Sequence, residues 1–391
     1  MSSKFVFQDC VYGKCALPPV CGRVVASRAF QRLRFISQMG PVQWVHHTAT
    51  HTRFEHSLGV ATLTYVWTDR LCKRHPTLMS DIDVLCLTLA GLLHDVGQGP
   101  WSHVYTQFVV RNGYPDWTPQ LQSTVVAYHI LSDPVVWDAC MSLGLTLWHI
   151  KFIQELILGS PANAPAGWEW QGHPRGYLFE FVCNTTTGVD TVKLDSLVRD
   201  THHLGINTKL DLDKLLTSTD LIFHEDTGTL RVAFSLGMQN VIRSVFSVNK
   251  TIQLVYASLD VCAISVMAMH AWVNVPDFLE GMRSLNGFLA LSDFTLQSNI
   301  HLYFFNDDLV SRRFPVMTGQ TRSPSPSRGP SGRARAGARA GAGANPDEEE
   351  YMSPLIARES DLQPPSFFPS PLTCLPYPPN EVMVRTFQIN A

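Results

Sequence analysis

Apolar residues recur along most of the chain with the spacing that is typical of helices. In residues 27–39 they stand three apart and define one face of an amphipathic helix: Phe30, Leu33, Ile36 and Met39. Residues 81–95, DIDVLCLTLAGLLHD, are apolar almost all round, which predicts a buried helix that stops at the following Gly-Gln-Gly-Pro. Similar patterns predict helices at 54–74, 120–132, 146–158, 176–184, 189–201 and 236–272.

A different pattern occupies residues 221–234, LIFHEDTGTLRVAF. Two arms rich in β-formers flank an Asp-Thr-Gly turn, which predicts a β-hairpin. The sequence therefore predicts a mostly α fold that carries a small hairpin as an appendage.

The composition changes after the helical body, which we place at residues 1–312. Residues 318–370 are rich in Ser, Pro, Gly, Ala and Arg, with an acidic run, and bury too little apolar surface to offset the entropy of ordering. We predict that this segment is disordered. Residues 371–391 contain aromatic and β-branched side chains and form a short tail that can dock back onto the body.

Composition and charge narrow the class of protein. The chain is 45% hydrophobic, which suffices for a substantial core, and its net charge of −3 gives no overall attraction to nucleic acid. Its nine cysteines include no CxxC pair, as suits a reducing compartment. The N-terminus lacks the apolar core of a signal peptide, and the longest apolar run, 261–269, is far short of the roughly 20 residues of a membrane span. We expect an intracellular protein, cytoplasmic or nuclear, without membrane association.

Two stretches carry candidate chemistry: HTRFEHSLGV at 51–60 and GLLHDVGQGP at 91–100. Together they offer the imidazoles of His56 and His94 and the carboxylate of Asp95, a donor set that suits a divalent metal. Each residue alone is better explained by a structural role, because a lone histidine on a helix is more often structural than a ligand. Spacing by itself leaves both interpretations open.

Four motifs follow one another in the chain: AFQRLRFISQMG, THTRFEHSLGV, GLLHDVGQGPWSH and GVDTVKLDSLVRDTHHLGI. In this order they resemble the HD-domain superfamily, specifically the catalytic domain of the SAM- and HD-domain-containing deoxynucleoside triphosphate triphosphohydrolases, over residues 5–272. Because the chain begins where that catalytic domain begins, no SAM domain is expected. The resemblance implies a helical HD fold in which a metal activates water, so that a deoxynucleoside triphosphate is split into deoxynucleoside and triphosphate.

The resemblance implies metal ligands at His56, His94 and Asp95, and a fourth, carboxylate ligand at the position that Val192 occupies. Asp195 is the nearer of two flanking aspartates round the helix, but neither lies on the same face as Val192. Three protein ligands still suit Zn, Fe, Mn or Mg, with water in the open positions. Loss of the fourth ligand predicts weakened binding.

The proton-transfer residues that the resemblance implies are mostly replaced. Gln98 and Pro119 stand where the family has histidines, and Thr106 stands where it has an aspartate. His103 is the retained member of this set. The joint loss predicts an inactive or strongly impaired enzyme.

The substrate positions are mixed. Gln38 and Asp200 match the family's contacts to the sugar 3′-hydroxyl. Retention for folding explains Asp200 equally well, and it explains Gln38 better, given the other losses. Arg53 and Lys193 match its phosphate contacts. Asp260, in contrast, places an anion where the family has a phosphate-binding cation.

Three hypotheses about function follow. The first is a degenerate homologue of the triphosphohydrolases that acts by binding, with nucleotide as one ligand. The second is an active enzyme with a rearranged site, and the third is an interaction protein that keeps only the scaffold. Because the family's enzymes work as assemblies, a homo-oligomer or association with an active relative is expected under the first. The predicted disordered segment also contains a tract of four arginines, Arg328, Arg333, Arg335 and Arg339. This tract is typical of a segment that contacts nucleic acid or serves as a targeting signal, and a solvated linker is at least as good an explanation.

Overall fold

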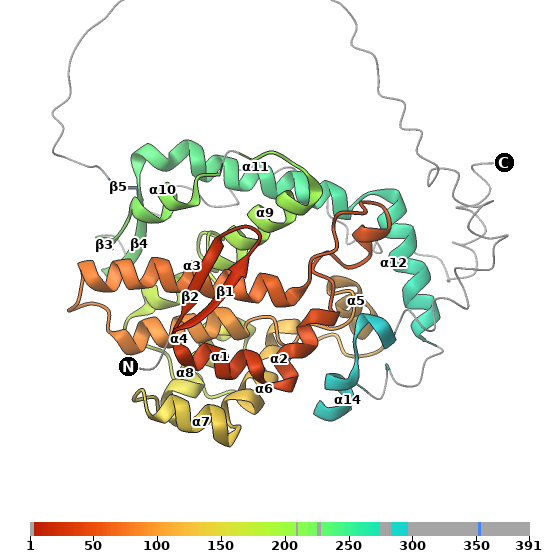
Figure 1. The fold of residues 1–391 in the computed structure, drawn as a ribbon, viewed down its shortest axis with the longest axis horizontal. Helices are drawn as coiled ribbons and strands as arrows, with labels where there is room; N and C mark the ends of the chain where they lie inside the picture. The colour runs from red at the N-terminus through yellow and green to blue at the C-terminus, as the bar shows by residue number, and fades with distance from the viewer. Residues whose placement is uncertain are drawn as a thin grey trace, which may run out of the picture.

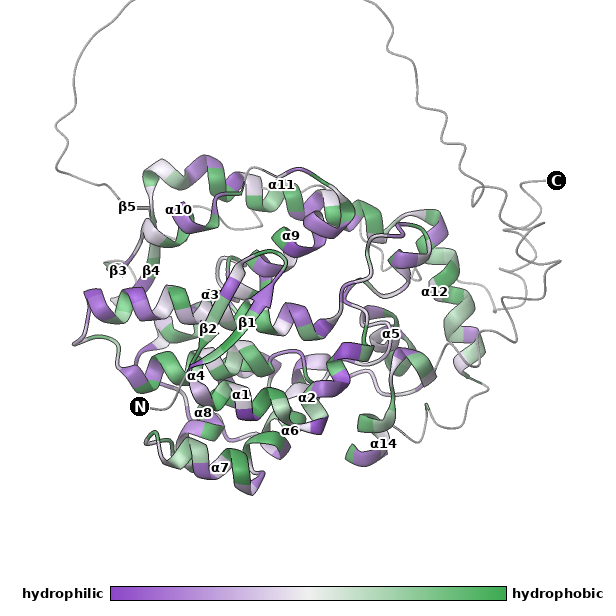
Figure 2. Cartoon of the chain, viewed as in Figure 1, coloured by the Kyte–Doolittle hydropathy of each residue, from purple (hydrophilic) through white to green (hydrophobic). Residues whose placement is uncertain are grey.

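The computed structural model describes residues 4–208, 210–224, 228–273, 278, 281, 283–295 and 351–352. Within these ranges the chain forms a helical body with two small antiparallel sheets, so the predicted fold class is confirmed (Figure 1). Hydrophobic residues recur along the helices of the body, where they supply the shared core (Figure 2). The segments predicted as disordered, 318–370, and as a docking tail, 371–391, lie outside the described residues except for the two at 351–352.

The centre of the body is built by α3 (Arg53–Arg74) and α4 (Asp81–Leu93), which pack against each other. On their other sides, α3 packs on α9 (Thr191–Leu204) and α4 packs on α8 (Leu147–Leu158), which in turn contacts α6 (Pro119–Leu131). All five helices were predicted, and α4 is buried along nearly its whole length, as expected. Ser80 and Asp83 form a capping box that fixes where α4 begins.

The remaining helices surround this centre. The α-helices are α1 (Pro19–Ala26), α2 (Arg28–Gln31), α5 (His103–Arg111), α7 (Pro134–Met141), α10 (Leu212–Thr217), α11 (Gln239–Tyr256), α12 (Leu259–Trp272) and α14 (Leu285–Ala290). The 3-10 helices are η1 (Arg32–Phe35), η2 (Gly40–Trp44), η3 (Pro161–Asn163), η4 (Gly176–Glu180) and η5 (Leu236–Met238).

The described residues also form two small antiparallel sheets. The predicted hairpin is confirmed as β3 (Thr219–His224) and β4 (Thr229–Ser235), and β5 (Tyr351–Met352) adds to β4 as a third antiparallel strand. A second hairpin, β1 (Phe5–Asp9) with β2 (Gly13–Leu17), was not predicted. Its turn is set by Asp9, whose carboxylate accepts the backbone N–H groups of Val11 and Tyr12.

The prediction of one helix over residues 27–39 is wrong for the residues after Phe35, where η1 ends. Ile36 is extended, with φ −123° and ψ 112°. Its carbonyl accepts the N–H of Arg53 at 2.9 Å, and the N–H of Gln38 donates to the carbonyl of His51 at 3.0 Å. Pairing with the segment before α3 therefore satisfies the backbone groups that a continuing helix would have used.

Two other helix predictions were too long. The pattern at 176–184 yields only the short η4, and the pattern at 236–272 divides after Tyr256 into two helices bent by 57°. Among the described residues no one helix combines the length and apolarity that crossing a membrane requires. Only the bent pair Leu236–Tyr256 with Leu259–Trp272 meets both criteria, and only when the two are taken together.

Candidate metal centre

Three buried side chains from the α3–α4 pair meet at one point. His56 lies in the first turns of α3, His94 caps the C-terminal end of α4, and Asp95 follows it. The Nε2 atom of His56 is 3.1 Å from Nε2 of His94 and 3.6 Å from Oδ2 of Asp95. The His94 Nε2 to Asp95 Oδ2 distance is 3.4 Å. We call this group the central triad; these are the three residues that the sequence analysis selected.

The outer contacts of the two histidines determine which ring nitrogen faces the centre. His56 Nδ1 lies 2.7 Å from a carboxylate oxygen of Asp195, and His94 Nδ1 lies 2.8 Å from the carbonyl of Gly91. Both partners are acceptors only, so each Nδ1 carries the hydrogen and each Nε2 presents its lone pair. Two lone pairs and a carboxylate oxygen thus face one another in a buried place. A cation between them would stabilise this arrangement.

The spacing fits a metal ion. Ligand atoms that each lie about 2.1 Å from one ion are about 3.0–3.4 Å apart. The three separations of 3.1, 3.4 and 3.6 Å agree with this within the tolerance expected of a metal site. The residues present therefore fit a divalent cation held by three protein ligands.

Burial and neighbouring charges set the protonation of the triad. Burial lowers the pKa of His56. It acts in the same direction on His94, but the adjacent carboxylate of Asp95 outweighs it and raises the pKa of His94. Burial alone would raise the pKa of Asp95, but Arg53 and then His94 hold that pKa well below its usual range. The triad keeps an ionised carboxylate, as a metal site requires.

Two side chains hold the carboxylate of Asp95. Arg53 forms an ion pair with Oδ2 at 2.6 Å and also donates to Ser102 Oγ and to the carbonyl of Gln38. Gln98 donates its amide to Oδ1 at 3.1 Å. Arg53, which was predicted to contact phosphate, is thus already paired with a residue of the triad, and Gln98 orients Asp95.

Val192 lies in the first turn of α9. The helix begins at Asp190, whose carboxylate accepts the Lys193 N–H at 2.8 Å and interacts electrostatically with His94. Asp195, one turn further, contacts His56. The half-buried Val192 stands between these two aspartates and packs against the core, where an apolar side chain supplies no ligand.

Asp195 does not occupy the position of the fourth ligand that the resemblance implies. It contacts His56 at Nδ1, the ring nitrogen that points away from the other two residues of the triad. Arg199 occupies both of its oxygens at 3.0 Å, and Arg199 in turn pairs with Asp9 at 3.0 Å. Asp195 is ionised, because this cation outweighs the effect of burial and lowers its pKa to about 2. Its role is to orient His56, which helix spacing alone did not reveal.

The remaining proton-transfer positions lie at two helix starts. His103 begins α5, and burial together with the nearby Arg53 lowers its pKa to about 4. It is therefore neutral near pH 7 and is not a proton donor there. Thr106 follows in the same helix, and Pro119 is the first residue of α6, a position that favours proline because no N–H is needed there.

Gln38 and Asp200, both predicted to contact the sugar, meet at His51. The N–H of Gln38 donates to the carbonyl of His51 at 3.0 Å, and Nε2 of His51 lies 2.8 Å from Oδ1 of Asp200. All three residues are buried. Among the described residues, the side-chain oxygen of Gln38 and Nδ1 of His51 have no hydrogen-bond partner, so two buried polar atoms stay available to a ligand. His51 was missed by the sequence analysis, although it opens the HTRFEH motif.

Lys193, the second residue predicted to bind phosphate, lies beside Val192 on α9 and is half-buried. A separate hollow of about 570 Å³ lies between segments 159–186 and 223–231. None of the candidate site residues of this subsection lines it. The sequence motifs therefore converge on the triad and its surroundings, and not on this hollow.

Residues 53–134, which contain all three members of the central triad, match the family model of the HD domain. This part of the chain therefore resembles the HD domain, and the helical body that surrounds it agrees with that resemblance.

Over and around this domain the chain is similar to deoxynucleoside triphosphate triphosphohydrolase SAMHD1. The Gallus gallus protein is 37% identical over 224 residues, which are 55% of this chain and 36% of that protein. The Homo sapiens protein is 36% identical over 54% of this chain and 35% of its own length. The SAMHD1 homolog of Dictyostelium discoideum is 28% identical over 76% of this chain and 54% of that protein. The matched region thus spans about a third of the length of the Gallus gallus and Homo sapiens proteins.

Proposed function

We propose that this protein is a nucleotide-binding HD-domain homologue of the triphosphohydrolases whose hydrolytic activity is strongly impaired. One observation carries the proposal: the central triad is complete, whereas the side chains around it are unsuited to proton transfer. The similarity to deoxynucleoside triphosphate triphosphohydrolases supports the choice of ligand class.

His56, His94 and Asp95 would hold a divalent metal, and the geometry of their three ligand atoms supports this. When bound, such an ion lowers the pKa of water and neutralises phosphate oxygens. The chain's own contribution is to orient the ligands. Asp195 fixes the ring of His56, and Arg53 places a cation beside Asp95.

The impairment follows from four positions around the triad. Val192 has no atom that can bind a metal, although the resemblance implies a ligand at its position. Gln98, Thr106 and Pro119 replace groups that titrate in the family. An amide, a hydroxyl and a proline ring do not exchange protons near neutral pH. His103 remains, but its pKa of about 4 leaves the protonated, proton-donating form almost unpopulated near neutral pH.

The sugar would lie near His51, where buried polar atoms lack partners in the described part of the chain. The backbone N–H of Gln38 and the carboxylate of Asp200 both bond to this residue. The side-chain amide of Gln38 and the carboxylate of Asp200 both suit a hydroxyl group. Arg53 connects this region to the triad through the carbonyl of Gln38, so nucleoside and phosphate subsites would be contiguous.

Two assays on the full chain test the proposal. Thermal melts with each deoxynucleoside triphosphate and Mg²⁺ or Mn²⁺ should show stabilisation that His94→Ala removes. Triphosphate release should be at least about 10³-fold slower than that of an intact relative, because losing one acid-base group alone costs about 10²–10⁴-fold. Turnover within tenfold of an intact relative, abolished by His94→Ala, would instead establish an active enzyme, the alternative that the complete triad favours.

We also propose that the protein acts by association, with itself or with an active relative whose turnover it lowers. Support comes from the retained body: the helices that pack around the triad persist although proton-transfer residues do not. The test is to mix the purified protein with an active relative. Unchanged activity over a tenfold molar excess, together with separate elution on a sizing column, would exclude the mixed assembly.

A further inference from the structure

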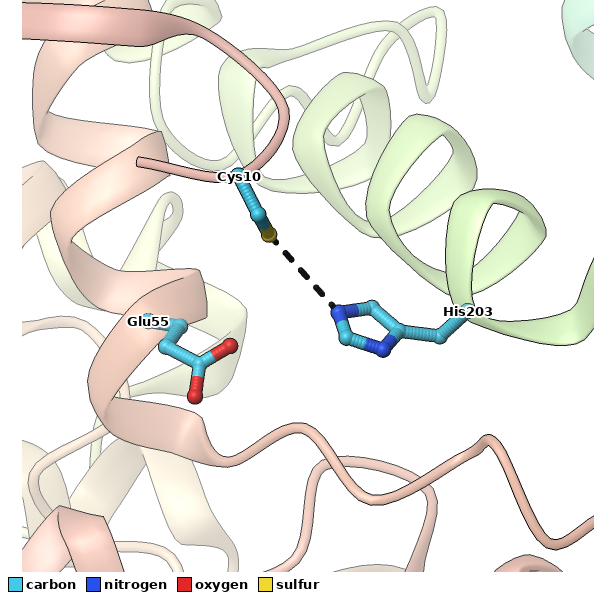
Figure 3. A group of neighbouring side chains, drawn as sticks. All are labelled: Cys10, Glu55 and His203. Carbon is cyan, nitrogen blue, oxygen red and sulfur yellow. Dashed lines mark hydrogen bonds between the residues drawn. The ribbon is translucent and has the colours of Figure 1, made fainter. Parts of the chain in front are cut away.

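A second group of metal-ligating atoms lies outside the central triad. Cys10 Sγ, a carboxylate oxygen of Glu55 and a ring nitrogen of His203 all lie within 4.8 Å of one another. They come from three separate elements: the turn after β1, the first turn of α3 and the last turn of α9. Figure 3 shows Cys10 and His203 pointing toward each other, with Glu55 alongside.

The distances suit Zn²⁺. With Zn–S near 2.3 Å and Zn–N near 2.1 Å, a tetrahedral site places sulfur and nitrogen about 3.6 Å apart. The Cys10 Sγ to His203 Nε2 distance is 3.8 Å. A thiolate, an imidazole and a carboxylate form a donor set that zinc accepts, with water as the fourth ligand.

Structural contacts account for these side chains only in part: Nη1 of Arg199 lies 3.8 Å from Cys10 Sγ. Cys10 is exposed, in contrast to the buried or half-buried state of the other described cysteines. The half-buried carboxylate of Glu55 has neither a hydrogen bond nor an ion pair within the described ranges. A carboxylate beside a thiol and an imidazole gains most from a cation between them.

The surroundings prepare two of the ligands. His203 stacks on His51 with ring centroids 4.2 Å apart, which fixes the plane of its ring. Burial and His51 lower the pKa of His203 to about 4, so the ring is neutral and its lone pair is available at neutral pH. Burial raises the pKa of the Cys10 thiol, but a metal displaces the thiol proton when it binds.

We propose that Cys10, Glu55 and His203 form a second divalent-cation site, suited to Zn²⁺, beside the central triad. The exposed thiol leaves an open path for the ion and for water. The proposal does not depend on whether the triad hydrolyses nucleotides, since the two groups share no residue.

Co²⁺ serves as the probe, because a thiolate ligand gives a charge-transfer band in the near ultraviolet that the sulfur-free triad does not give. The full chain is titrated with Co²⁺ as wild type and as Cys10→Ser, Glu55→Gln, His203→Gln and His94→Ala. Cys262→Ser, which changes a half-buried cysteine elsewhere, is the matched control. Competition with Zn²⁺ then gives the zinc affinity of each protein.

We expect the band in wild type, in His94→Ala and in Cys262→Ser, and its loss in Cys10→Ser. His203→Gln and Glu55→Gln should weaken Co²⁺ binding by at least about tenfold, since even outer-shell changes cost about 10–100-fold. The variants should keep the wild-type thermal melt without metal, which separates ligand loss from misfolding. A wild type without the band, or a band that persists in Cys10→Ser, overturns the proposal, as does unchanged affinity in His203→Gln.

Discussion

Asp195→Asn tests the network that orients the central triad. The carboxylate is fully buried and accepts three hydrogen bonds, one from His56 at 2.7 Å and two from Arg199 at 3.0 Å. An amide has a single acceptor oxygen and turns an NH₂ group toward one of these donors. The substitution therefore leaves Arg199 with Asp9 as its one remaining charged partner among the described ion pairs.

The expected loss of stability follows from this geometry. Breaking a buried ion pair by removing one partner costs about 3–5 kcal/mol. Because Asp9 still neutralises Arg199, we expect the lower end, about 3 kcal/mol of unfolding free energy. Metal affinity at the triad should fall by about 10–100-fold, as for other outer-shell partners of ligating histidines.

Denaturant unfolding without metal and metal titration with the full chain give the two quantities. Asp213→Asn is the matched control, since Asp213 pairs with Arg70 at the surface with a side chain that is 77% exposed, and we expect it to change stability by less than about 1 kcal/mol. If Asp195→Asn matches this control in stability and binds metal as wild type does, the orienting role of Asp195 is refuted.

Two further predictions concern the surroundings of the triad. Val192→Asp should raise metal affinity by at least about tenfold, because it restores a carboxylate where the resemblance implies one; metal analysis after dialysis checks this, and equal occupancy in both proteins contradicts it. His103 has a depressed pKa of about 4, so its contribution to stability is present above pH 6.5 and is lost as the pH falls through 4. His103→Gln should therefore lose less stability than wild type between pH 6.5 and 4 in thermal melts, and parallel curves would count against a buried neutral ring.

The sequence predicted those parts of the site that lie on long helices. The patterns at 54–74 and 81–95 located α3 and α4, and the motifs on them identified His56, His94 and Asp95. Period and spacing do not, however, specify how a helix is rotated against its neighbour. That rotation decides that Asp195 contacts the outer nitrogen of His56 rather than the ion position.

Contacts between segments far apart in the chain were beyond the reach of local patterns. Cys10 and His203 are 193 positions apart, and nothing in the residues around either one points to the other. The hairpin β1–β2 was missed because Val6 is apolar although it is exposed, so the sequence FVFQD does not alternate even though the burial of its residues does. Likewise Asp293, which accepts the backbone N–H groups of Ser37 and Trp101, joins regions that no single motif spans.

The pairing of Arg199 with Asp9 sets an order of events in the assembly of the protein. Asp9 shapes the turn of the first hairpin and also neutralises a buried cation on α9. During synthesis the hairpin leaves the ribosome long before α9 does. Until Arg199 has emerged, the carboxylate of Asp9 has no buried cation on α9 to pair with. Residues of α9 supply both the cation that pairs with Asp9 and the carboxylate that orients His56, so a chain truncated before α9 lacks both contacts.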